Sequence, residues 1–314
     1  NKEYIAKKIA NSGRKVLNRR ESRKRIYQAI DEINRQTGYS IAILCQMAKI
    51  SRSAYYKHNK YAKHRVHSKA NVAIMQAIAE LYTKVHGIYG YRRMTMNINL
   101  MFGSHYNTKR IQRLMHAIKL SSVIRRKKKK YLSSKPEVTN DNILNRKFHS
   151  SKQGEKWLTD VTEFKLTTGR KAYLSAILDL WDNSIISYNL GCFNDNQLVL
   201  ETIDTATESF PGKCILLHSD RGSQYTNKTY NCRLEEAGIT HSMSRVGRCI
   251  DNGPMEGFWG IIKSEMYYLN KFHNIKELSS AIDRYIKFYN TERRQQKLNK
   301  LAPLEFRNQY PEYT

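Results

Sequence analysis

The stretch Lys156-Trp-Leu-Thr-Asp-Val-Thr-Glu-Phe-Lys-Leu166 alternates in side-chain character with a period of two residues, which predicts a β-strand. Gly169 and Arg170 follow it as a turn signal, and two more strand-like runs cover residues 171–180 and 185–193. Because the connections are short, we predict three consecutive antiparallel strands.

The sequence after these strands alternates between helical and strand patterns. Helices are predicted over residues 197–210, 227–237, 254–268 and 275–291, and strands over residues 214–218 and 239–243. The resulting order β-β-β-α-β-α-β-α is that of a ribonuclease-H-like α/β fold, a mixed sheet with flanking helices. We assign it to residues 151–314.

The amino-terminal part reads as all-α. Helices are predicted over residues 21–35, 41–48 and 52–57, with Ser40 and Ser51 as caps, and their proportions are those of a helix-turn-helix. In that interpretation the third helix enters a DNA groove and presents Arg52, Tyr55, Tyr56 and Lys57. The alternative is a small basic bundle that only packs. This first region covers residues 1–62.

A second helical DNA-binding region is predicted over residues 63–131, with a helix at 68–83 and further helices on either side of Asn107, a plausible cap. Cations suited to phosphate contacts are Arg92, Arg93, Lys109, Arg110 and Arg113, although a solvated basic face would look the same. The region ends in a block of six cations that we expect to track nucleic acid: Arg125, Arg126, Lys127, Lys128, Lys129 and Lys130. Residues 132–150 read as a linker.

Charge is distributed very unevenly along the 314 residues. Residues 1–150 hold 34 Lys and Arg against 7 Asp and Glu, whereas residues 151–314 hold 21 against 20, so nearly all of the net charge of +28 lies in the first half. Such a half attracts polyanions, which favours double-stranded DNA as the partner over a membrane or a small-molecule substrate. Five scattered cysteines without paired spacing argue against a zinc site, and with the lack of a long apolar run they favour a cytoplasmic protein.

Three acidic residues are candidates for chemistry: Asp160 inside the first strand, Asp220 just after the fourth, and Glu256 in the first turn of the helix over residues 254–268. Carboxylates are hard oxygen ligands for Mg²⁺ or Mn²⁺, and a pair of such ions can clamp the attacking and leaving oxygens of a phosphoryl transfer. Lys263, seven residues after Glu256, lies nearly in phase on the same helix face and could reach a DNA phosphate.

Other acids compete for this assignment. Strand alternation points Glu163 to the opposite face, and helix phase turns Glu265 about 180° from Glu256. Asp251 is a loop or cap candidate, and Asp179 and Asp182 read as turn or surface acids. Spacing alone still leaves the possibility that the three acids are unrelated surface residues.

Several motifs in order resemble the transposases of the third insertion-sequence family, which belong to the retroviral-integrase-like group. They are Trp157-Leu-Thr-Asp-Val-Thr, His218-Ser-Asp-Arg-Gly-Ser-Gln-Tyr-Thr, Ser242-Met-Ser-Arg, Asp251-Asn-Gly-Pro-Met-Glu-Gly-Phe-Trp with Lys263, Tyr285–Asn290 with Arg293, and Tyr89-Gly-Tyr-Arg-Arg. The resemblance implies that Asp160, Asp220 and Glu256 are the catalytic acids and Lys263 the helix lysine. Gly253 and Gly257 depart mildly from the family pattern, in which Ala and Ser are common.

We therefore predict a DNA transposase that binds the ends of an insertion sequence and catalyses metal-dependent 3′-end cleavage and strand transfer, with two Mg²⁺ or Mn²⁺ ions per site. A homodimer or higher assembly on terminal-repeat and target DNA is expected, in the bacterial cytoplasm at the nucleoid. The resemblance also implies an upstream reading-frame product that is absent from this sequence. The rival hypotheses are a ribonuclease-H-like endonuclease without joining activity and a DNA-binding regulator with an inactive catalytic domain.

Overall fold

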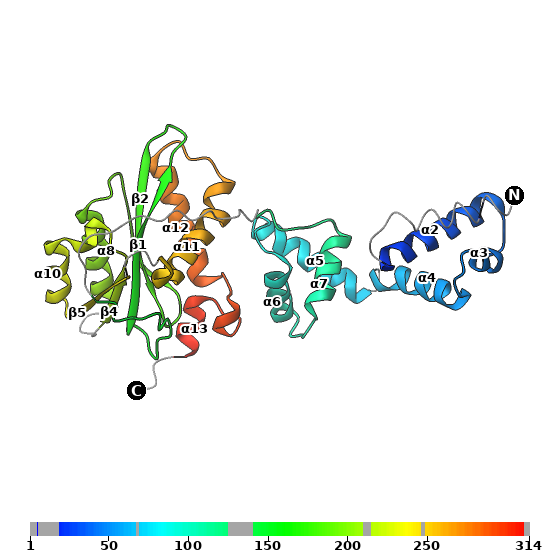
Figure 1. The fold of residues 1–314 in the computed structure, drawn as a ribbon, viewed down its shortest axis with the longest axis horizontal. Coiled ribbons are helices and arrows are strands. Elements are labelled where there is room, and N and C mark those ends of the chain that lie inside the picture. Colours follow the sequence, from blue (N-terminus) through cyan, green and yellow to red (C-terminus); the bar gives the residue numbers. More distant parts are fainter. Residues whose placement is uncertain are drawn as a thin grey trace. The chain divides into compact units, whose positions relative to one another are not determined.

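The structure is a computed structural model that describes residue 5 and residues 19–66, 69–124, 141–209, 215–245 and 249–310 (Figure 1). The basic block at residues 125–130, predicted to track nucleic acid, lies outside the described residues. The chain divides into two compact units. The first comprises Asn1–Thr83 and Asn107–Leu120, and the second comprises Lys84–Tyr106 and Ser121–Thr314.

The first unit begins with three helices, α2 (Arg19–Thr37), α3 (Ile41–Met47) and α4 (Arg52–Val66). The predicted caps are confirmed, because the Ser40 hydroxyl accepts from the Ile43 amide at 3.5 Å and the Ser51 hydroxyl from the Ala54 amide at 3.2 Å. The helices enclose a small apolar core that includes Ile30, Leu44 and Tyr55. Helix α4 extends well beyond the predicted end at residue 57.

Two further helices complete the first unit, α5 (Lys69–Lys84) up to Thr83, and α7 (Thr108–Ala117). The Asn107 side chain accepts from the Lys109 amide at 2.9 Å and caps α7, as predicted. Between them in sequence lies α6 (Tyr91–Met101), which belongs to the second unit. The partition of the chain thus differs from the sequence-based one at residues 84–106.

A five-stranded mixed sheet forms the centre of the second unit, with the order β3-β2-β1-β4-β5. Its strands are β1 (Lys156–Lys165), β2 (Lys171–Asp179), β3 (Ile185–Gly191), β4 (Ile215–Ser219) and β5 (Ile239–Met243). β1 pairs antiparallel with β2 and parallel with β4, so the strand containing Asp160 lies in the middle of the sheet. The predicted ribonuclease-H-like fold is confirmed.

Helices cover both faces of this sheet (Figure 1). α8 (Asn196–Ser209) and α10 (Lys228–Glu236) pack on one face over Trp157 and Leu217, with the short α9 (Ser223–Thr226) beside them. α11 (Gly253–Glu265) and α12 (Ile275–Thr291) pack on the other face over Leu158 and Phe164. Odd and even residues of β1 therefore enter different cores, as strand alternation requires.

The carboxyl-terminal end contains a helix that sequence patterns did not predict, α13 (Pro303–Gln309). Its Arg307 donates to Asp182 at 2.5 Å and lies 3.6 Å from Asp179. Both acids have 0% exposure, so of the two predicted alternatives the surface position is wrong, whereas Asp182 does lie in the turn that follows β2. Burial and the nearby Asp182 raise the pKa of Asp179 to about 6. These acids hold the β2–β3 turn onto α13.

A helix that crosses a membrane must be both long and apolar. Within the described ranges, no helix of this chain meets both conditions.

Removal of the buried Ile262 side chain should destabilise the second unit. Ile262 has 0% exposure between α11 and the sheet, so Ile262→Ala should lower the free energy of unfolding by about 2–5 kcal/mol. The three tryptophans, Trp157, Trp181 and Trp259, all lie in the second unit, so urea denaturation followed by tryptophan fluorescence reports on it. Ile261→Ala, at the half-buried neighbouring position, is the control and should cost less. Equal losses would contradict the packing described for α11.

Candidate active site

Strand register brings two of the predicted acids side by side. Leu158 on β1 pairs in parallel with His218 on β4, and Asp160 and Asp220 each lie two residues beyond this pair. Parallel neighbours are about 4.8 Å apart, and side chains two residues further along point to the same face. Asp160 therefore shares the face of Leu158 and Phe164, which is the face covered by α11.

Helix α11 brings the third acid to this face and is fixed to β1 by two hydrogen bonds. The side-chain amide of Asn252, just before the helix, donates to the Thr159 carbonyl at 3.0 Å. Nearly two turns into the helix, the Trp259 indole N–H donates to Asp160 Oδ2 at 2.9 Å. Glu256 is half-buried and lies three residues before Trp259, hence on the same side of α11.

The electrostatics of the pair oppose ionisation. Burial, and then the neighbouring Asp220, raise the pKa of Asp160 to about 7, although hydrogen bonds from the Val161 amide and from Trp259 act in the other direction. Burial also raises the pKa of Asp220, against a hydrogen bond from the Gly222 amide at 2.8 Å. Two carboxylates in this setting resist carrying a full negative charge each.

Glu256 affects the ionisation of Asp160 less than Asp220 does. It contributes the weakest of the effects that raise the pKa of Asp160. Among the described residues, no three His, Cys, Asp or Glu side chains stand close enough together to hold a metal ion. The structure thus brings Asp160 and Asp220 together, and leaves the Glu256 carboxylate beside them rather than in a closed three-acid cage.

Asp251, considered as a loop or cap acid, has a different part in the site. It has 0% exposure and accepts from Arg146 at 2.6 Å, from Asn142 at 2.9 Å, and from the side chain and backbone of Arg245. The hydrogen bonds from Arg245 hold its pKa well below the ordinary range. Asp251 therefore fixes the turn that leads into α11.

The remaining sequence-based arguments about acids agree with the structure. Glu163 forms a surface ion pair with Lys171 at 2.9 Å on the outer part of β1. Glu265 is buried at the far end of α11. At Gly253 and Gly257 an added Cβ would meet nothing within 4 Å, so these two departures from the family pattern do not alter the packing of α11.

The amino-acid sequence around this fold and site matches known proteins. Two integrase core domain models match residues 150–249 and 256–310, and an HTH-like domain model matches residues 69–128. The putative transposase InsK for insertion sequence element IS150 of Escherichia coli (strain K12) is 42% identical over 274 residues, which are 86% of this chain and 94% of that protein. The chain belongs to the insertion-sequence transposases. It is therefore a DNA transposase with an integrase core.

Two other relatives illustrate the range of this family. An uncharacterized transposase-like protein of Haemophilus influenzae (strain ATCC 51907 / DSM 11121 / KW20 / Rd) is 41% identical and covers 65% of this transposase and 94% of its own length. The transposase InsF for insertion sequence IS3A of Escherichia coli (strain K12) is 25% identical, and the match covers 87% of this chain and 96% of InsF.

Sequence reasoning missed two residues that shape the site of this transposase, Trp259 and Asn252. Both lie inside the Asp251–Trp259 motif, and neither was given a role. The signal for Trp259 was its position three residues after Glu256, which places it on the same helix face. No local pattern indicated that Asn252 would donate to the backbone of β1.

Lys263 lies on the expected face of α11, four residues after Trp259. Its ammonium group is 5.4 Å from the centre of the Phe164 ring, and Phe164 is four residues after Asp160 on β1. The residue is half-buried and remains close to the same face of the sheet as the acids.

Residues predicted to contact DNA fall into two groups. Exposed side chains suited to such a contact are those of Arg52, Tyr56, Lys57, Arg92, Lys109 and Arg113. Tyr55 is different, because only 3% of it is exposed, it packs against Tyr27, and its hydroxyl donates to Asp31. The prediction that Tyr55 contacts DNA is therefore corrected: it is a core residue of the first unit.

Two of the predicted phosphate contacts are engaged by protein groups instead. Arg110 donates twice to Asn71, at 2.8 and 3.2 Å, within the first unit. Arg93 forms an ion pair with Glu265 at 3.3 Å, and its side chain is 24% exposed. Spacing in the sequence could not distinguish these arginines from Arg92, which is exposed.

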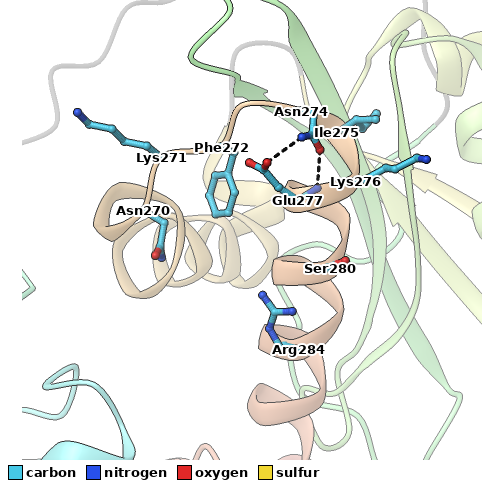
Figure 2. A pocket seen from close by; sticks show the side chains of 9 residues that line it. All are labelled: Asn270, Lys271, Phe272, Asn274, Ile275, Lys276, Glu277, Ser280 and Arg284. Carbon is cyan, nitrogen blue, oxygen red and sulfur yellow. Dashed lines mark hydrogen bonds between the residues drawn. The ribbon is translucent and has the colours of Figure 1, made fainter.

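A separate hollow of about 730 Å³ lies between the end of α11 and the start of α12 (Figure 2). Three cations and one acid line it, namely Lys271, Lys276, Arg284 and Glu277. The Glu277 carboxylate accepts a hydrogen bond from the side-chain amide of Asn274 at 2.7 Å. None of the three candidate catalytic acids lines this hollow.

The raised pKa of Asp160 predicts a pH-dependent stability that Asp160→Asn removes. The carboxyl group has a pKa of about 7 in the fold and about 3.9 in the unfolded chain, so between these values the folded chain holds one extra proton. This contribution is complete below about pH 4 and is lost as the pH rises to about 7, by at most about 1.4 kcal/mol per pH unit. Metal-free urea denaturation at several pH values measures it.

The matched control for this experiment is Glu163→Gln, a half-buried acid on the same strand that is paired with Lys171. It should keep the wild-type slope between about pH 5 and about pH 7. A constant stability difference between Asp160→Asn and wild type across this range would contradict the raised pKa.

Proposed function

We propose that Asp160, Asp220 and Glu256 are the catalytic carboxylates with which this transposase cleaves the 3′ ends of its element and joins them to target DNA. The observation that carries this proposal is the parallel register of β1 and β4, which sets two half-buried carboxylates side by side under the helix that contains Glu256. Two ionised carboxylates this close repel each other, and a bound metal ion relieves the repulsion. The metal ion can in turn hold a phosphodiester at this position.

The donor set fits a divalent metal ion. The raised pKa of Asp160 reflects unbalanced negative charge, which is the condition that a bound cation relieves. Asp160 and Asp220 would hold it, and Glu256, which is beside them on α11, would complete the set. Mg²⁺ or Mn²⁺, as two ions per site, would lower the pKa of the attacking water or 3′-hydroxyl and balance charge on the departing 3′ oxygen.

Other residues of the chain support this chemistry. The Trp259 indole orients the Asp160 carboxylate by holding its Oδ2 atom, which leaves Oδ1 to the amide of Val161 and to a ligand. Lys263, close to the same face, offers a positive charge to a phosphate of the DNA end. Asn252 and Asp251 keep the start of α11 in place while substrate binds and leaves.

We infer that DNA is also held outside the catalytic acids. The exposed cations Arg52, Lys57, Arg92, Lys109 and Arg113 would contact phosphates of the terminal repeats and of the target, with affinity that falls steeply as salt rises. The basic block at residues 125–130 would add to this attraction. A dimer or higher assembly is proposed because two element ends need two sites, and the charge of the first half suits action at the bacterial nucleoid.

Substitution of the acids tests the proposal directly. Purified Asp160→Asn, Asp220→Asn and Glu256→Gln proteins should lose at least about a hundredfold in the rate of 3′-end cleavage of a labelled terminal-repeat duplex with Mn²⁺, because each loses a metal ligand. Strand transfer of a pre-cleaved end should fall in parallel. Glu163→Gln, on the other face of β1, should retain activity.

Two outcomes of this assay would contradict the proposal. Wild-type activity in Asp220→Asn would exclude the site assignment. Cleavage by the wild-type protein with no joined product at any Mn²⁺ concentration would instead support a nuclease without strand-transfer activity.

The cleavage rate should also depend on pH through Asp160. At low Mn²⁺ the rate should rise with pH up to about 7 and then level off, because the pKa of Asp160 is raised to about 7 and only the carboxylate binds metal. Higher Mn²⁺ competes with the proton and should move the midpoint to lower pH. A midpoint that does not move with Mn²⁺ would show that another group controls the profile.

A further inference from the structure

The far end of α11 contains a second buried carboxylate whose donors come from three parts of the chain. Glu265 has a side chain that is only 4% exposed. It accepts from Arg293 twice, at 2.7 and 2.8 Å, from the Tyr285 hydroxyl at 2.8 Å, and from Arg93 at 3.3 Å. Arg93 lies 172 residues earlier, on α6.

The segment around Arg93 belongs to the second unit, which also contains the candidate catalytic acids. Tyr89 is 1% exposed, its ring lies 6.4 Å from that of Phe288, and its hydroxyl reaches the Glu292 carbonyl at 3.5 Å. The Arg93 guanidinium lies 5.3 Å from the centre of the Tyr89 ring. Tyr89 and Arg93 therefore pack on the ends of α11 and α12, although both fall inside the stretch that matches the HTH-like domain.

The charges of this cluster are arranged to keep Glu265 ionised. Burial acts against ionisation, but the hydrogen bonds and charge of Arg293 keep the pKa of Glu265 below its ordinary value, and Arg93 adds to this effect. Two arginines therefore face one acid. Loss of Arg93 leaves one donor fewer on a buried acid.

Glu265 and Glu256 are nine residues apart on one helix, which corresponds to about 14 Å of rigid rod. The rod is bonded to β1 at its start through Asn252 and in its middle through Trp259. Its far end is bonded through Glu265. Three attachment points along one helix fix both its tilt and its rotation, and these determine where the Glu256 carboxylate lies.

We propose that Arg93 is a positioning residue for Glu256: it holds the end of α11 through Glu265 and so sets the distance of Glu256 from Asp160 and Asp220. The proposal rests on the proposed function of these three acids. Arg93 thereby serves the metal-binding acids from within the HTH-like stretch, and it does not serve as a phosphate contact. Its neighbour Arg92 is exposed and stays available to DNA.

The adjacent arginines give a matched pair of variants, Arg93→Met and Arg92→Met. Arg93→Met should weaken Mn²⁺ binding to the DNA-free protein about tenfold, as loss of a supporting residue does, measured by electron paramagnetic resonance of free Mn²⁺. The Mn²⁺ concentration for half-maximal cleavage should rise by a similar factor. Affinity for terminal-repeat DNA without metal should stay within about twofold of wild type. Arg92→Met should show the reverse pattern.

Two companion variants separate positioning from loss of fold. Arg93→Lys keeps the charge and one donor, so it should restore part of the Mn²⁺ affinity. Tyr285→Phe removes a different donor to Glu265 and should weaken Mn²⁺ binding in the same direction, with a smaller effect. Circular dichroism and thermal unfolding identify any variant that has lost its structure, and the comparison then rests on the remaining ones.

The proposal is overturned if Arg93→Met lowers DNA affinity while Mn²⁺ binding is unchanged, because Arg93 would then be a DNA contact. It is equally overturned if neither quantity changes, or if Tyr285→Phe leaves Mn²⁺ binding at the wild-type level. Failure of the underlying function gives a different result, namely wild-type Mn²⁺ binding and cleavage in Asp220→Asn.

Discussion

Repulsion between two half-buried carboxylates is the constraint on which the rest of this structure depends. Asp160 and Asp220 are neighbours because β1 and β4 run parallel in a fixed register, and no rotation of either side chain removes both from the same face. The fold offsets part of the cost with hydrogen bonds from Val161, Trp259 and Gly222. The repulsion that these hydrogen bonds do not offset attracts a cation. The same pair of carboxylates therefore costs the metal-free fold stability and gives it the ability to bind metal.

The sheet supplies only two of the three acids, so the placement of α11 decides whether a complete site can form. At both ends, the position of α11 is fixed by residues that lie elsewhere in the chain. Asp251 is clamped by Arg146 and Arg245 before the helix starts, and Glu265 is clamped by Arg293 after it has passed the acids. The proposal for Arg93 treats α11 as rigid between these two clamps, so that a change at either one displaces Glu256.

Local patterns in the sequence were sufficient for the fold and for the faces of its elements. Strand alternation separated Asp160 from Glu163, and helix phase separated Glu256 from Glu265. The errors concern pairings between distant residues, such as Tyr55 with Asp31, Asp182 with Arg307, and Arg93 with Glu265. A single sequence contains spacing but no record of which distant residues meet, so a buried arginine and an exposed one look alike. Asp160, Asp220 and Glu256 were proposed as the catalytic acids because a family resemblance supplied the missing pairing.

The distinction between cations that pair with protein groups and cations that are exposed also applies to the strongly basic first half of the chain. Its charge is not all available to DNA, because Arg93 is committed to Glu265 and Lys84 pairs with Glu292. Both lie in residues 84–106, which form part of the catalytic unit, whereas α7, which follows Asn107, belongs to the first unit. The HTH-like stretch is thus divided between two units. Within this stretch, a substitution at residues 84–106 or 121–124 falls in the unit that contains the candidate catalytic acids, whereas one at residues 69–83 or 107–120 falls in the unit that contains α7.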